Sequence, residues 1–120
     1  MTIEPSLEHR VKNLASLCST IIQAVEKAVI GKTEILQKIM SALLSTGGHI
    51  LLEDNPGLAK TLIANSFSHA LGLDFKRVQF TPDLLPGDIT GGYIFDSGQN
   101  KFVLHKGPLF THIFLADEIN

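Results

Sequence analysis

A short stretch near the middle of the chain constrains the fold more than any other part of the sequence. Ile50-Leu51-Leu52 is an apolar run of strand length, and Lys60-Thr61 opens a helical pattern that continues to Leu71. The loop between them contains Pro56-Gly57, which can make a tight bend. A strand that leads through such a loop into a helix N-terminus is typical of phosphate-binding loops, in which backbone N–H groups surround a phosphate. The arrangement fits an α/β fold in which this loop, residues 55–62, and the helix start at Lys60 bind a phosphate.

The loop departs from the usual pattern G-x-x-x-x-G-K-[ST] at two positions. Asp54 and Ala59 stand where glycine is expected. Alanine adds one methyl group, so close approach of a phosphate stays feasible if φ at Ala59 is negative. The Asp54 carboxylate shares the sign of a phosphate, and at ~6 Å and an effective dielectric constant of ~20 the repulsion is about 3 kcal/mol. The alternative to a nucleotide loop is a plain strand-to-helix turn with a solvated Lys60.

A second apolar run, at the end of the chain, leads into two acids. Residues 113–116 predict a buried strand, and Asp117 and Glu118 follow it. In phosphoryl-transfer enzymes the first such acid supports Mg²⁺ and the next activates the attacking water. Apolar strands that end in acids are also common without this role. Because open parallel sheets bind ligands at the carboxyl ends of their strands, the two motifs together favour a nucleotide site, with Lys60 at the phosphates and Thr61 at the metal.

The hydrophobic pattern predicts the remaining elements. Apolar residues at steps of three and four indicate a helix over residues 7–28, which Ser6 can cap, and others over 35–44 and 60–71. The segment around Pro82 to Gly92 predicts a loop or a broken helix, and the turn-rich five at 96–100 predicts a β-hairpin over 93–105. Strands alternating with helices predict a largely parallel sheet covered on both faces. The strands are expected at residues 49–53, 74–81 and 113–116.

Composition excludes several classes of function. The 120 residues carry a formal charge of −2 and a pI near 6.2, so the chain has no electrostatic footprint for nucleic acid or for an anionic membrane surface. No apolar run reaches the ~18 residues that a membrane span needs, and no secretion signal opens the chain, so we expect a cytoplasmic protein. The single Cys18 excludes an internal disulfide and is expected in the core. The five histidines show no metal-ligand spacing.

Four blocks carry a resemblance to a known family. The segments HILLEDNPGLAKTL, RVQFTPDLLPGDITGGYIFD, KFVLHKGPLFTHIFLADEIN and the upstream VIGK resemble the MoxR family of AAA+ ATPases, in the same order and at similar spacing. Alanine often precedes the loop lysine in this family, whereas glycine stands at the position of Asp54. The resemblance implies ATP and Mg²⁺ as ligands, with Asp117 and Glu118 as the Walker B pair. It further implies that the adenine and phosphates contact the residues Ile30, Gly31, Asn55, Pro56, Gly57, Leu58, Ala59, Lys60, Thr61 and Leu62.

The resemblance also implies a domain organisation. Residues 1–28 would form an N-terminal helix packed on the core, and residues 29–120 part of a three-layer α/β/α P-loop domain, with the hairpin at 93–105 as an insert in its second helix. The sensor 1 strand, the arginine finger and the helical lid of complete members would be absent. The implied function is that of a chaperone-like, ring-forming ATPase that works with von Willebrand factor A-type partner proteins, weak or inactive in this short form. The alternative is a non-catalytic remnant or interaction module that binds no nucleotide.

Overall fold

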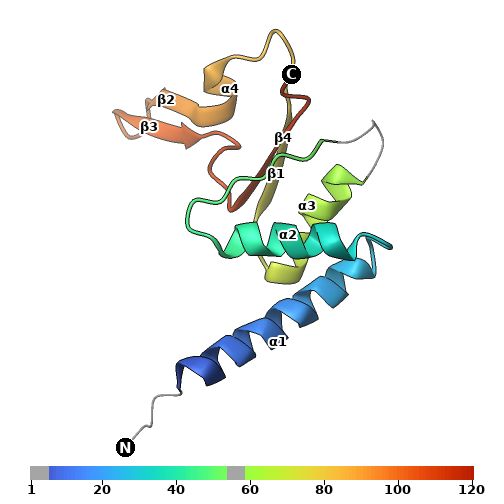
Figure 1. The fold of residues 1–120 in the computed structure, drawn as a ribbon. Helices are drawn as coiled ribbons and strands as arrows, with labels where there is room; N and C mark the ends of the chain where they lie inside the picture. The colour runs from blue at the N-terminus through green and yellow to red at the C-terminus, as the bar shows by residue number, and fades with distance from the viewer. Residues whose placement is uncertain (1–5, 54–58) are drawn as a thin grey trace, which may run out of the picture. The chain divides into compact units, whose positions relative to one another are not determined.

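The computed structural model describes residues 6–53 and 59–120, and the chain divides into two compact units (Figure 1). The first unit is Met1–Leu71 and the second is Gly72–Asn120. The first contains the helices α1, α2 and α3, and the second contains two pairs of strands and a short helix. The α/β class predicted from the sequence is confirmed.

Three helices build the first unit: α1 over Leu7–Glu26, α2 over Thr33–Leu44 and α3 over Lys60–Leu71. The predicted cap of α1 is confirmed, because the Ser6 hydroxyl accepts a hydrogen bond of 3.3 Å from the backbone N–H of His9. Both α2 and α3 contact α1. None of the described helices is long and apolar enough to cross a membrane.

The hydrophobic core lies where the three helices meet. Most of its members are three or four residues apart in the sequence. This spacing places them on the same face of a helix, as the sequence pattern predicts. Cys18, expected in the core, is half-buried and packs against it. Each fully buried aliphatic or aromatic side chain contributes about 1.5–3 kcal/mol relative to an exposed one, so this cluster is the main source of stability in the unit. The buried residues are Val25, Val29, Leu36, Ile39, Met40, Ile63 and Phe67.

The strand predicted at residues 49–53 is wrong: this segment has no regular secondary structure. A strand needs a neighbouring strand to take up its backbone N–H and C=O groups, and the described part of Met1–Leu71 contains helices only. The apolar side chains that suggested a strand are largely unsheltered, with Leu51 67% exposed. Only Leu52 of the run packs against the core.

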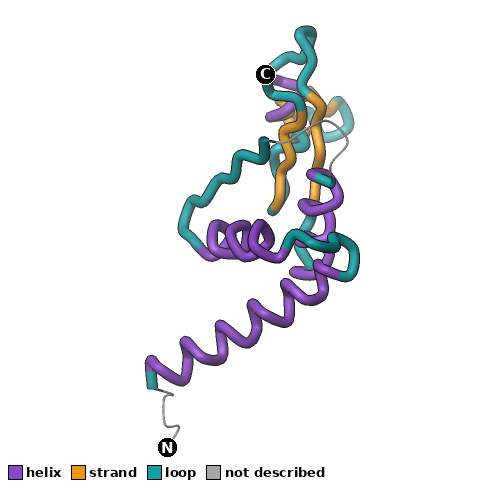
Figure 2. The backbone as a smooth tube through the Cα atoms, turned by 45° about the vertical axis from the view of Figure 1, so that its right-hand side comes forward, coloured by secondary structure: helices purple, strands orange, loops and turns teal. Residues whose placement is uncertain are grey.

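A parallel pair of strands organises the second unit. β1, Phe75–Gln79, pairs with β4, Ile113–Asp117, and the register places Phe75 opposite Ile113 and Gln79 opposite Asp117. Figure 2 shows the two strands side by side, although 33 residues lie between the end of β1 and the start of β4. The carboxyl ends of both strands therefore meet at the same edge, which is the geometry expected of an α/β sheet that binds a ligand.

The predicted hairpin forms between β2, Gly91–Asp96, and β3, Lys101–Lys106, which are antiparallel (Figure 1). The Asp96 carboxylate closes the turn by accepting the N–H groups of Gly98 and Gln99 at 2.9 and 3.2 Å. The rings of Phe95 and Phe102 pack edge to face across the strands, with centroids 5.3 Å apart. Such cross-strand pairs stabilise a two-stranded ribbon that has little other cover.

The segment before the hairpin contains a short helix, α4, over Pro86–Thr90. Pro86 stands at its first position, where proline is favoured, and the Asp88 carboxylate accepts the backbone N–H of Leu85 at 2.9 Å. The helix ends at Gly91, whose φ of 77° lies in the left-handed region. The prediction of a loop or a broken helix is thus resolved as a single turn of helix that delivers the chain into β2.

Candidate functional site

The first half of the predicted site is the N-terminus of α3. The helix begins at Lys60, and the backbone N–H of Ile63 already donates to the Ala59 carbonyl at 2.7 Å. The positive end of the α3 macrodipole lies here, which makes this end favourable for an anion. Lys60 and Thr61 are half-buried, and Leu62 is exposed. The other predicted phosphate contacts, Asn55 to Leu58, lie outside the described residues.

The backbone at Ala59 differs from what the sequence led us to expect. Close phosphate approach was expected to require a negative φ at Ala59, but its φ is 39°. An L-residue in the left-handed region places its Cβ too close to its own carbonyl, at a cost of about 1–2 kcal/mol. The conformation is therefore one that suits the glycine of the usual pattern, and alanine occupies it under strain.

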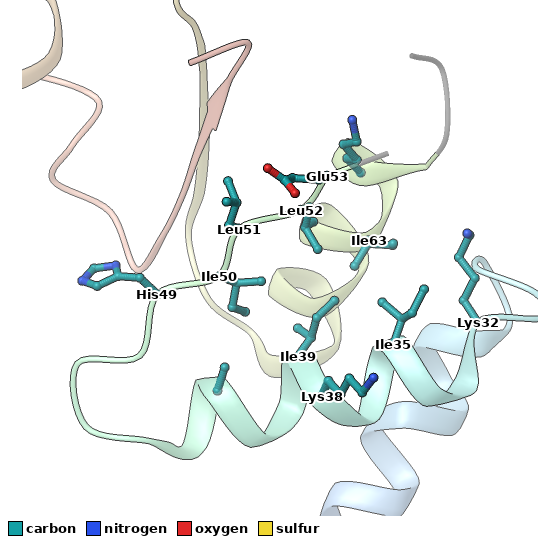
Figure 3. Close-up of a pocket in the computed structure, with 12 residues that line it drawn as sticks. Lys32, Ile35, Lys38, Ile39, His49, Ile50, Leu51, Leu52, Glu53 and Ile63 are labelled. Atoms are coloured by element: carbon teal, nitrogen blue, oxygen red, sulfur yellow. The ribbon is translucent and has the colours of Figure 1, made fainter. Parts of the chain in front are cut away.

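A cavity of about 430 Å³ lies beside this helix end, between α2, the irregular segment and α3 (Figure 3). Its size falls within the range of pockets that hold small ligands. Apolar side chains such as Ile35, Ile39 and Ile63 form much of its lining. Lys60 lies at the cavity together with Lys32 and Lys38, so cationic groups accompany the apolar wall. This composition suits a ligand with an apolar part and an anionic part.

The residues expected to contact adenine lie in the turn between α1 and α2. Ile30 is 85% exposed, and Gly31 has a φ of 79°, so the turn relies on glycine. Neither residue lines the cavity, although the next residue, Lys32, does. Their contact with a base stays a prediction.

The second half of the predicted site is the carboxyl end of β4. Asp117 is the last residue of the strand, and its carbonyl accepts the N–H of Phe80 at 2.8 Å. Glu118 follows with a φ of 55°, so the chain leaves the strand abruptly at the second acid. Asp117 is half-buried and Glu118 is exposed. Left-handed backbone at a non-glycine residue is uncommon and occurs often at functional sites.

Two side chains of β1 hold these acids, and sequence reasoning missed both. Arg77 donates to the Asp117 carboxylate, and Gln79 donates from its amide to the Glu118 carboxylate at 2.9 Å. The sequence did contain a hint of this pairing. Side chains alternate between the two faces of a strand, so Arg77 and Gln79, two residues apart, share one face of β1. Only the parallel register shows that this face carries Asp117.

Lys60 and Thr61 belong to the first unit, whereas Asp117 and Glu118 belong to the second. The meeting of all four around one ligand therefore stays a prediction. Outside the gaps at 1–5 and 54–58, no three His, Cys, Asp or Glu side chains are grouped so as to hold a metal ion. The predicted site offers three side chains with oxygen donors, Thr61, Asp117 and Glu118. Mg²⁺ accepts such hydroxyl and carboxylate oxygens when phosphate oxygens and water complete its coordination shell.

The loop after β1 contains a carboxyl with a shifted pKa. The Thr81 hydroxyl and the backbone N–H of Asp83 hydrogen-bond to the Asp83 carboxylate and hold its pKa below the ordinary value. Hydrogen bonds to the charged form favour ionisation, so this side chain stays anionic at neutral pH.

Comparison with known proteins identifies the family. Residues 49–120 match the ATPase family associated with various cellular activities (AAA). The chain is 43% identical over 96 residues to Chaperone MoxR1 of Mycobacterium tuberculosis, an alignment covering 80% of this chain and 25% of that protein. The chain belongs to the MoxR family of AAA+ ATPases.

Further similarity extends over almost the whole chain. It is 41% identical over 109 residues to the uncharacterized protein YeaC of Bacillus subtilis, covering 91% of this chain and 34% of YeaC. A crystal structure of a candidate ATPase from Cytophaga hutchinsonii superposes with a TM-score of 0.70 at 40% identity, covering 92% of this chain and 36% of that one. The chain thus spans about a third or less of the length of these relatives, and its fold corresponds to part of a P-loop core.

Proposed function

We propose that this MoxR-family chain binds ATP with Mg²⁺ at the N-terminus of α3. The observation that carries the proposal is the placement of Lys60 and Thr61 as the first two residues of that helix, beside a cavity with a cationic edge. The macrodipole of α3 favours phosphate at its N-terminus, and the Lys60 ammonium adds a charge-assisted contact to the terminal oxygens. In this proposal residues 55–62 hold the phosphates, and Ile30 and Gly31 contact the adenine.

The remaining roles concern the metal and the water. The Thr61 hydroxyl and the Asp117 carboxylate support Mg²⁺, which draws charge from the phosphates, and Glu118 orients and deprotonates the attacking water. Glu118 is exposed, and the Gln79 amide fixes its carboxylate, so one oxygen has a defined direction before any ligand arrives. Hydrolysis in this chain is expected to be weak, since phosphoryl transfer depends strongly on an arginine finger.

The setting proposed for the whole protein follows its family. We infer a cytoplasmic, chaperone-like remodeller that forms a homo-oligomeric ring and works with a von Willebrand factor A-type partner, with the hairpin of β2 and β3 as the family insert. Residues 1–28 and 29–120 are proposed as the N-terminal helix and the partial ATPase domain. A second candidate is an interaction module without nucleotide binding, which the aspartate in place of glycine at position 54 favours.

Titration calorimetry of the 120-residue chain with MgATP or a slowly hydrolysed analogue tests the proposal. We expect measurable binding that Lys60→Ala abolishes, because that variant loses the cation at the phosphates. Lys12→Ala is a matched control, since Lys12 lies on α1 in an exposed ion pair with Glu8 and does not line the cavity. The interaction-module alternative is favoured if a folded chain gives no heat at millimolar nucleotide, and equal affinity in wild type and Lys60→Ala would place the ligand elsewhere.

A further inference from the structure

The Asp117 carboxylate is already occupied by a side-chain cation. Both Nε and Nη2 of Arg77 donate to the same oxygen, Oδ2, at 3.0 and 2.5 Å. The pair is partly sheltered, with side chains 45% and 24% exposed for Arg77 and Asp117. Charge-assisted contacts of this length are among the stronger hydrogen bonds, and shelter reduces their screening by solvent.

The parallel register explains why Arg77 reaches this oxygen. Arg77 lies opposite Leu115 in the ladder, and Gln79 lies opposite Asp117. Residues two apart on a strand share a face, so Arg77 and Asp117 are diagonal neighbours within reach of a long side chain. Gln79 is directly opposite Asp117 but donates to Glu118 instead. The guanidinium is therefore the charged partner of Asp117, while the neutral amide is the partner of Glu118.

We propose that Arg77 is a built-in counter-ion that competes with the divalent cation for Asp117. This inference rests on the proposed function, which assigns Asp117 to Mg²⁺. A metal ion that approaches Asp117 must displace the guanidinium from Oδ2 or share the carboxylate with this like charge. Either way, the affinity of the protein for the metal ion in the absence of nucleotide is lowered. Nucleotide phosphates bring negative charge that offsets this opposition. Arg77 thereby makes metal binding depend on nucleotide and prevents an uncompensated carboxylate in the ligand-free protein.

Metal binding without nucleotide tests the proposal directly. We would titrate the full chain with Mn²⁺ and follow free Mn²⁺ by electron paramagnetic resonance. Arg77→Met keeps the length of the side chain but removes its charge, and we expect it to bind Mn²⁺ about three- to tenfold more tightly, the scale of a partly exposed ion pair. Arg77→Lys keeps the charge and should stay near wild type. Arg10→Met, which removes the other arginine of the chain, should leave the affinity unchanged.

The gain in Arg77→Met should disappear when Asp117→Asn is added, because the competition is for that carboxylate. Equal or weaker Mn²⁺ binding in Arg77→Met, or a gain that survives Asp117→Asn, would overturn the inference. If the variants fold poorly, the wild type provides a second measurement. Its two arginines give two Nε–H signals in nuclear magnetic resonance, and saturating Mg²⁺ should shift only that of Arg77; an unmoved signal also overturns it.

These results separate the inference from the proposed function. A metal affinity that rises in Arg77→Met, in a chain that gives no heat with MgATP, supports the counter-ion role and refutes nucleotide binding. A chain that binds MgATP with equal metal affinity in wild type and Arg77→Met keeps the proposed function and refutes the counter-ion role.

Discussion

Ala59 is the residue whose backbone most constrains the α3 end of the site. Its φ of 39° lies where glycine is favoured, directly before the lysine that opens the helix. Strain of this kind persists only where the surroundings enforce it, and it is frequent at ligand sites. Glu118 has the same feature at the end of β4, with a φ of 55°. Both predicted halves of the site thus contain a residue in left-handed backbone.

We predict that Ala59→Gly stabilises the chain. Removing the Cβ relieves about 1–2 kcal/mol of strain, of which the greater freedom of glycine in the unfolded state offsets about 0.5–1 kcal/mol. The net gain expected in urea unfolding is therefore about 0.5–1 kcal/mol. Ala64→Gly, five residues further on and inside α3, is the matched control and should lose about 1 kcal/mol. A loss of stability in Ala59→Gly would show that φ at this residue is not left-handed in solution.

At the scale of elements, the junction of α4 with β2 is the tightest point of the second unit. A Cβ on Gly91 would lie 1.9 Å from the His105 carbonyl oxygen and 2.5 Å from the Gly107 nitrogen, and φ there is 77°. Both atoms belong to the backbone of the hairpin's return, so they cannot move aside as a flexible side chain would. The close approach of these segments therefore requires glycine.

We predict that Gly91→Ala disrupts the hairpin, with a loss of at least about 2 kcal/mol from left-handed strain and backbone collision. Gly92→Ala is the control, because a Cβ there meets nothing within 4 Å. Amide hydrogen exchange across β2 and β3 is the measurement, and protection should fall in Gly91→Ala alone. If protection is the same in both variants, the junction is looser than its backbone contacts indicate.

At the scale of the whole molecule, the two units differ in how well their apolar side chains are covered. All seven residues of the hydrophobic core lie in Met1–Leu71. The unit Gly72–Asn120, which is fully described, has no completely buried residue, and Tyr93, Phe102 and Phe110 are exposed. Exposed apolar patches of this kind favour association. The chain also spans about a third or less of its relatives, so their activity does not transfer directly.

We predict that the 120-residue chain hydrolyses ATP more slowly than about 1 s⁻¹, a common rate for enzymes. An arginine finger contributes about 10³–10⁵ in rate, and of the two arginines in this chain Arg77 is engaged by Asp117. The residual rate should vanish in Glu118→Gln, which keeps the shape of the side chain but cannot take a proton from water. Phosphate release from the purified monomer measures both. Turnover above that rate, lost in Glu118→Gln, would require Arg10 or Arg77 to act as the finger.

The sequence by itself determined the local elements, because their signals are local. Helical periodicity, the Ser6 cap and the turn at 96–100 depend on residues a few positions apart, and the structure confirms each. The position of Lys60 at a helix start was equally readable, since the helical pattern of apolar residues begins directly after it. The same holds for Asp117 at the end of an apolar strand.

Only the tertiary structure decided the features that depend on distant residues or on backbone angles. The run 49–53 has the composition of a strand but finds no strand partner among the described residues of its unit, and pairing is a property of two segments. The positive φ of Ala59 arises from the path of the chain into α3 and is invisible in residue type. The bond from Arg77 to Asp117 joins residues 40 positions apart, and it follows from a parallel register that no local pattern encodes.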